Sequence, residues 1–138
     1  MSSYISVQIG VSGQEVSNAR LLIKDGTTND ITSLKNNGLT VYGNLTIETS
    51  GGTTSANPGT ITLKSTLSTT SNNGLYVTKG TKSTCGNLTI ESGNVYCESA
   101  ASSGITCGTL CDSNFVLSAG YLNTYAAGGT SNSYSNGI

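Results

Sequence analysis

The sequence contains no histidine and few charges, with seven acidic and six basic side chains in 138 residues. Histidine is the most common general base and a very common metal ligand, so its absence excludes His-containing catalytic triads and weakens the case for an enzyme. The basic residues are scattered singly and form no stripe that would neutralise phosphates. No window approaches the roughly 20 apolar residues of a membrane span. We therefore expect a non-enzymatic protein with no cofactor, no metal, no nucleic-acid partner and no membrane span.

Large apolar residues are also scarce. Leu, Ile, Val and Phe make up 29 residues, whereas Ser, Thr, Asn and Gly make up 74. That apolar content lies near the level at which a chain stays disordered, but disordered chains usually carry a high net charge and this one carries −1. We therefore expect one ordered unit whose apolar residues are too few to shelter one another and are covered by sister chains.

The apolar residues alternate with polar ones, as in half-buried strands, and helical periodicity is nearly absent. The strands are separated by Gly-Asn, Asn-Gly and Gly-Gly pairs, which suit tight turns. These features predict an all-β fold of short strands. The apolar-polar-apolar triplets are 39–41, 45–47, 61–63, 75–77, 88–90, 95–97, 105–107 and 115–117.

Two short motifs recur along the chain. Asn-Asn-Gly-Leu at 36–39 returns at 72–75, and Gly-Asn-Leu-Thr-Ile-Glu at 43–48 returns at 86–91. The second copy therefore contains an insertion, which we place in a loop from Thr78 to Cys85. Internal repeats of this length are typical of stacked architectures, in which one unit buries its apolar face only against the next. The repeats predict a β-helical or β-solenoid-like stack.

The sequence divides into three segments. Residues 1–35 differ in texture from the repeats and are expected to form an N-terminal β attachment or cap segment, with a hairpin that turns at Asp25-Gly26. Residues 36–120 form the predicted β-repeat shaft. Residues 121–138 are rich in Gly, Ser, Asn and Tyr and read as a C-terminal tail.

Candidate site residues are structural rather than catalytic. Cys85, Cys97, Cys107 and Cys111 lack the spacing of zinc sites, so they are either disulfide-bonded or buried free thiols. For Cys97 and Cys107 we favour free thiols packed in the core, but a disulfide between them, across adjacent repeats of the predicted stack, stays open. The predicted core consists of Leu39, Val41, Leu45, Ile47, Leu75, Val77, Leu88, Ile90, Val95 and Ile105.

Two further motifs have a chemical and a structural interpretation. A paired-carboxylate glycosidase site is conceivable, but Glu48 and Glu91 occupy the same position of two repeats, as solvated strand ends do. The patterns Asn44-Leu-Thr46 and Asn87-Leu-Thr89 match N-glycosylation acceptors. We interpret their asparagines as turn residues at the corners between strands.

The Gly-Asn-Leu-Thr-Ile repeats resemble the shafts of fibre and spike proteins of tailed phages and large DNA viruses, which repeat runs of the type G-N-L-T-[VI]. The resemblance covers roughly residues 36–118. It implies an intertwined homotrimer, an N-terminal segment that docks to other capsid or tail proteins, and a distal part that faces the host. The irregular repeat length, the cysteines and the lack of an evident globular head favour a shaft, a capsid-attached spike or a minor shell component.

We therefore expect a virion structural protein that acts by self-assembly, most simply as a homotrimer. One alternative is a carbohydrate-binding or adhesive module that uses exposed tyrosines against a host-surface glycan. Another is a subunit of an extracellular filament, in which the strand from Tyr4 to Ile9 is donated to the next subunit.

Overall fold

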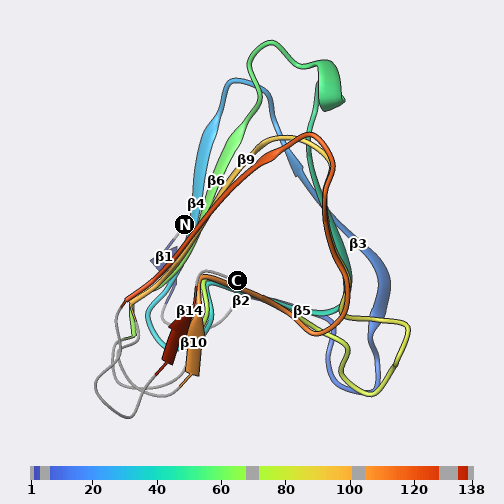
Figure 1. Ribbon diagram of the computed structural model, residues 1–138, viewed down its shortest axis with the longest axis vertical. Helices are drawn as coiled ribbons and strands as arrows, with labels where there is room; N and C mark the ends of the chain where they lie inside the picture. Colours follow the sequence, from blue (N-terminus) through green and yellow to red (C-terminus); the bar gives the residue numbers. More distant parts are fainter. Residues whose placement is uncertain (1, 4–6, 68–71, 101–104, 128–133, 137–138) are drawn as a thin grey trace.

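The computed structural model describes residues 2–3, 7–67, 72–100, 105–127 and 134–136, and this part of the chain is all-β, as predicted. Figure 1 shows the strands overlying one another along three sides of a triangle. The short 3-10 helix η1 (Gly52–Thr54) lies at one corner, and no α-helix occurs in the described residues. All eight apolar-polar-apolar triplets fall within strands.

Each side of the triangle is a stack of strands. The first side consists of β1 (Ser2–Ser3), β4 (Thr28–Ser33), β6 (Thr60–Ser65), β9 (Asn94–Ser99) and β13 (Tyr121–Ala126). The second consists of β2 (Val7–Ile9), the first part of β5 (Leu39–Thr49), β7 (Leu75–Thr78) and β11 (Thr109–Cys111). The third consists of β3 (Val16–Ile23), the rest of β5, β8 (Leu88–Ile90) and β12 (Phe115–Leu117). A separate pair is formed by β10 (Ile105–Cys107) and β14 (Tyr134–Asn136).

Paired strands run parallel throughout these sheets. Parallel neighbours need a long connection, and here the connection is the passage of the chain along the other two sides. We call one such passage a level. The successive levels are β1–β3, β4–β5, β6–β8, β9–β12 and β13–β14.

The strand β5 runs along two sides of the triangle and bends at Gly43. This glycine has φ of 143°, and a Cβ placed on it would lie 2.0 Å from the carbonyl oxygen of Val16 in the level below. Only a residue without a side chain fits this corner. Gly86, which occupies the same position of the second repeat, donates its N–H to the Gly43 carbonyl at 2.8 Å.

The repeats lie directly over one another. Leu39 pairs with Leu75 and Leu45 pairs with Leu88, so the two sequence spacings correspond to the register of adjacent levels. The extra residues of the longer repeat lie in the loop 79–87 between β7 and β8, close to the predicted position. This loop projects from the lower right corner of the triangle in Figure 1.

Inward-facing apolar side chains form columns that continue from level to level. Nine of the ten predicted core residues are at most 2% exposed, and the side chain of the tenth, Ile105, lies outside the described part of the structure. Other buried members of the core include Ala19, Ile23, Ile61, Leu63 and Cys97.

Two expectations are wrong. The cover for the apolar residues comes from other levels of the same chain, because two inward-facing residues per strand suffice when strands above and below close the interior. Asp25-Gly26 does not form a hairpin: β3 pairs with β5 and β4 pairs with β6, so the chain turns a corner there and does not reverse.

The terminal segments join the same sheets. The described part of residues 1–35 contributes β1 to β4, which pair with strands of the repeat region or with each other. Residues 121–126, expected in the tail, form β13 beside β9. Of the predicted donor strand, Val7–Ile9 form β2, whereas Tyr4 to Ser6 lie outside the described residues.

Candidate functional site

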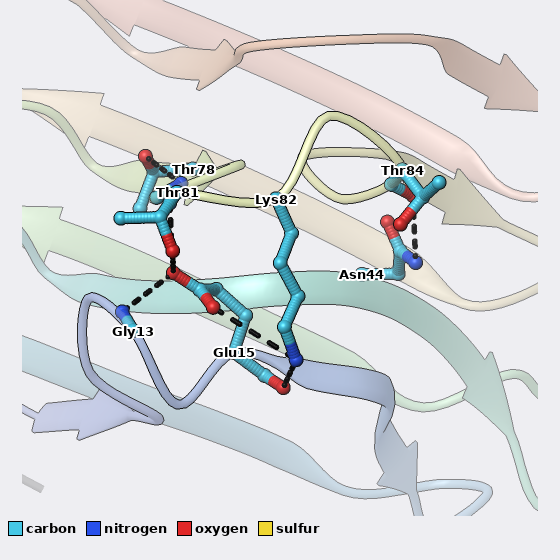
Figure 2. Close-up of polar contacts among 8 residues, drawn as sticks. Gly13, Glu15, Asn44, Thr78, Thr81, Lys82 and Thr84 are labelled. Atoms are coloured by element: carbon cyan, nitrogen blue, oxygen red, sulfur yellow. Dashed lines mark hydrogen bonds and ion pairs between the residues drawn. The ribbon is translucent and has the colours of Figure 1, made fainter.

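One polar cluster joins the turn before β3 to the loop 79–87 and is centred on Glu15 (Figure 2). Its Oε1 accepts hydrogen bonds from the N–H of Gly13 at 2.7 Å and from the N–H and hydroxyl of Thr81 at 2.8 and 2.9 Å. The Nζ atom of Lys82 lies 3.9 Å from Oε2 and also donates to the Glu15 carbonyl at 3.5 Å. We call this cluster the Glu15 clamp.

The Glu15 clamp favours the charged carboxylate although the residue is only 6% exposed. Hydrogen bonds from the N–H groups of Thr81 and Gly13 outweigh burial and lower the pKa of Glu15 to about 2. The partners lie 66 residues apart in sequence and two levels apart in the stack. The Glu15 clamp therefore links the first level of the stack directly to the third level.

A second carboxylate, that of Asp25, organises the corner after β3. It accepts hydrogen bonds from the N–H of Gly51 at 2.9 Å, from the hydroxyl of Ser55 at 2.5 Å and from the hydroxyl of Thr49. The hydroxyl bonds, with that of Ser55 foremost, lower the pKa of Asp25 to about 2. Asp25 thus holds the end of β5 and the residues around η1 against the preceding level.

Asparagines form ladders at two corners of the stack. At one corner, Asn114 donates from Nδ2 to Oδ1 of Asn87 at 3.1 Å, and Asn87 donates to Oδ1 of Asn44 at 2.8 Å. The backbone N–H of each upper residue bonds to the same oxygens. At another corner, Asn37 accepts from the N–H of Asn73 at 2.7 Å. The asparagines of the glycosylation-like motifs are therefore corner residues, as predicted.

The remaining carboxylates of the described chain are mostly engaged in ion pairs or turns. Glu48 pairs with Arg20, and Glu98 with Lys64 at 2.8 Å. Asp112 accepts from the hydroxyl of Thr78 at 2.7 Å and from other groups at the start of the loop 79–87. Within the described residues, no group of three Cys, Asp or Glu side chains gathers where it would hold a metal ion.

The four cysteines are free thiols. Cys85, Cys97 and Cys107 are buried and Cys111 is half-buried. Burial raises the pKa of Cys97 to about 12, and it raises the pKa of Cys107 and Cys111. Cys97 and Cys107 lie on β9 and β10 of one level, not opposite each other on adjacent levels, and Cys97 is registered against Leu63 and Thr124.

Tyrosines gather on the outer face of the first side. The rings of Tyr96 on β9 and Tyr121 on β13 have centroids 5.7 Å apart, and Tyr125 is 59% exposed. Aromatic faces of this kind suit stacking against a sugar or a neighbouring protein.

Sequence reasoning located the core and the corner asparagines but missed both carboxylate clusters. The pair Asp25-Gly26 predicts a hairpin turn and gives no sign of the hydrogen bonds that the Asp25 carboxylate accepts. The sequence around Glu15 gives no sign of its role, because its partner Thr81 lies in a distant loop. A membrane-crossing helix is not found in the part of the chain that the structure describes.

No family model matches the sequence, and no curated protein or solved structure matches it significantly.

Proposed function

We propose that this chain is a non-enzymatic structural subunit of a virion, in a fibre, a spike or a capsid-associated component, and that its stacked levels form a β-solenoid-like shaft. The observation that carries the proposal is the repetition of apolar columns and asparagine ladders from one level to the next. In such a stack the backbone hydrogen bonds between levels run along one direction on all three sides. A mechanical force along that direction is distributed over the many backbone hydrogen bonds between two levels, as a shaft under tension requires.

The carboxylates support a structural role. A glycosidase needs two carboxyl groups that face each other across a substrate site. Here Glu15, Asp25 and Asp112 hold turns, and Glu48 and Glu98 pair with basic side chains. These five carboxylates contact groups of their own chain, although the buried Oε2 of Glu15 has no hydrogen-bond partner and lies 3.9 Å from Nζ of Lys82.

Self-association is part of this proposal, with the homotrimer and docking to other capsid or tail proteins as predicted states. Because the core is covered within one chain, a trimer would associate through outer faces or ends, without sharing a core. Exposed apolar side chains available for such contacts include Leu22, Val116, Tyr121 and Tyr125.

Immunogold labelling of particles released by cells that carry this sequence tests the proposal. We expect an antibody against the chain to label the particle surface or its projections. Label confined to the soluble fraction of the cells, with particles unlabelled, would refute a structural role in the virion. A pre-immune serum serves as the control.

A carbohydrate-binding or adhesive module is the second candidate, favoured by the exposed tyrosines of β13. Under this hypothesis Tyr121→Ala and Tyr125→Ala abolish binding on a glycan array, because each removes a stacking face. Leu22→Ala, which truncates an exposed apolar side chain on the other end of the stack, leaves binding unchanged. Absence of glycan binding by the wild-type chain would remove this candidate.

Strand donation has less support. Val7–Ile9 of the proposed donor already pair as β2 with β5 of their own chain. Donation would require this pairing to open and re-form in a neighbour.

A further inference from the structure

A hollow lies at the corner of the stack where the third side meets the first side. Its volume is roughly 160 Å³, and its lining comes from the loop around η1 and from the turns that precede β9 and β13. Figure 1 shows this loop extending beyond those turns at the upper corner of the triangle. Successive levels of the stack therefore contribute to one recess in the surface. We call it the corner hollow.

Small polar side chains line the corner hollow. Thr53 and Ser55 belong to the loop around η1, and Ser92 and Asn94 lie at the start of β9. None of the described residues that line it carries a charge. Hydroxyl and amide groups both donate and accept hydrogen bonds. The carboxylate of Asp25 accepts from the hydroxyl of Ser55 at 2.5 Å, so an anion in the hollow would meet a negative neighbour. The lining therefore favours an uncharged ligand with several hydrogen-bonding groups.

An aromatic ring adjoins the corner hollow. Tyr121, the first residue of β13, contributes to its lining and is 49% exposed. The ring of Tyr121 packs against that of Tyr96 on β9, with the centroids 5.7 Å apart and the planes tilted by 52°. This contact restrains the Tyr121 ring beside the hollow while about half of the residue stays accessible. A restrained and accessible aromatic ring suits stacking against a ligand.

The aromatic surface continues from the corner hollow along the outer face of the first side. Asn123 and Tyr125 follow Tyr121 at the exposed positions of β13. Tyr96 is registered against Asn123, so it lies in the adjacent level between the two exposed tyrosines. Four residues along a parallel strand span about 13 Å. A ligand that begins in the hollow therefore has room to continue as a short chain over Asn123 toward Tyr125.

These features favour a neutral saccharide over other small ligands. A phosphorylated ligand needs basic side chains, but the described lining has none and residues 83–138 include neither Lys nor Arg. A wholly apolar ligand would leave the hydroxyl and amide groups of the lining without partners. A sugar ring has hydroxyl groups at its edge and an apolar face of C–H groups. It therefore matches both the polar lining and the ring of Tyr121.

We propose that the corner hollow binds the terminal unit of a neutral oligosaccharide. Tyr121 stacks against the ring of that unit, and Thr53 and Asn94 bond to its hydroxyl groups. The units that follow lie along β13 toward Tyr125. The inference goes beyond the structural role in the virion. It rests on the carbohydrate-binding candidate, for which it names the site and the class of sugar.

A substitution that fills the corner hollow tests this site. Thr53→Tyr places a ring in the hollow from an exposed position, and Ser83→Tyr, the matched control, places the same ring on the exposed loop 79–87 at another corner. Circular dichroism confirms that each variant is folded. The probes are neutral oligosaccharides that end in glucose, galactose, mannose or N-acetylglucosamine, with sialyllactose as the anionic comparison, and titration calorimetry measures their binding to the full chain.

We expect the wild type and Ser83→Tyr to bind at least one of the neutral oligosaccharides and to bind sialyllactose at least tenfold more weakly. Thr53→Tyr and Tyr121→Ala should each weaken binding of the neutral oligosaccharide at least tenfold. Both the filled hollow and the lost ring then act on the same ligand.

Three results overturn the inference in different ways. If the wild type binds none of the neutral oligosaccharides, both the corner hollow and the carbohydrate-binding candidate are refuted. If Tyr125→Ala abolishes binding but Thr53→Tyr leaves it unchanged, the sugar lies elsewhere on β13, so the hollow is refuted while the candidate stands. Tighter binding of sialyllactose refutes the neutral class. None of these results alters the immunogold test on which the virion function depends.

Discussion

Oδ1 of Asn44 accepts two hydrogen bonds from Asn87, one from the side-chain Nδ2 at 2.8 Å and one from the backbone N–H at 3.1 Å. One amide side chain therefore fixes both the position and the rotamer of its counterpart one level above. The same arrangement recurs between Asn87 and Asn114.

Asn87→Ala should lower the free energy of unfolding by about 1–3 kcal/mol, because it removes the middle member of this ladder and leaves part-buried polar groups without partners. Chemical denaturation with urea measures the change. Asn18→Ala, at an exposed position of β3, is the control and should stay within about 0.5 kcal/mol of wild type. Equal stability of the two variants would contradict a stabilising ladder.

Gly43→Ala and Gly13→Ala form a matched pair of substitutions at positive φ. Both incur about 1–2 kcal/mol for placing an L side chain in this region. At Gly13 nothing lies within 4 Å of the new Cβ, whereas at Gly43 the Cβ meets the Val16 carbonyl, which adds about 1–3 kcal/mol. Thermal unfolding should therefore rank Gly43→Ala clearly below Gly13→Ala, and the reverse order would contradict the tight corner in β5.

Acid should destabilise the protein through Glu15 and Asp25. Their pKa values in the folded chain are about 2, below the ordinary values of 4.5 and 3.8. A depressed folded pKa means that the stabilisation is complete above the ordinary pKa and is lost as the pH falls toward 2. The melting temperature should fall between about pH 5 and pH 2.

Glu15→Gln should be less stable at neutral pH and should show a shallower decline of melting temperature with acid, since it has no charge to lose at that position. Glu91→Gln is the matched control at an exposed position and should keep the wild-type profile. A profile for Glu15→Gln that parallels the wild type would mean that the Glu15 clamp contributes no pH dependence.

The cysteines should differ in reactivity. Cys97 is fully buried with a pKa of about 12, so at pH 8 it remains a protonated, covered thiol. Cys111 is half-buried and should be alkylated first when the native protein is treated with iodoacetamide and followed by peptide mass spectrometry. Labelling of Cys97 as fast as Cys111, or a native mass that indicates a disulfide, would contradict this arrangement.

Alternation along the chain was sufficient to predict the strands and most of the core. The pairing of Leu45 with Leu88 could be predicted because identical motifs surround the two residues. Identical local sequences form the same corner and turn the same side chains inward. The spacing of the motifs also located the loop 79–87. These features are local or repeated, so they can be read from one chain.

Closure of the core within one chain was not predictable from composition. The expectation that the chain has too few apolar residues for its own core applies to globular domains, in which many elements contribute side chains to a wide interior. In a narrow three-sided stack, Ile47 needs only Leu21 below, Ile90 above and the facing sides of its own level. The Glu15 clamp could not be predicted for a different reason. It depends on the position of Thr81, in a loop 66 residues away, and no sequence periodicity indicates that position.

The bond from Thr81 to Glu15 bypasses the level between them. In a stack whose levels contact only their neighbours, the outermost level could unfold at little cost in free energy. Unfolding would then spread inward one level at a time. Because Glu15 bonds to the loop 79–87, which lies two levels away, the first level cannot unfold without disturbing the interior of the stack. Hydrogen exchange in β3 should therefore report on opening of a larger cooperative unit and not on simple end fraying.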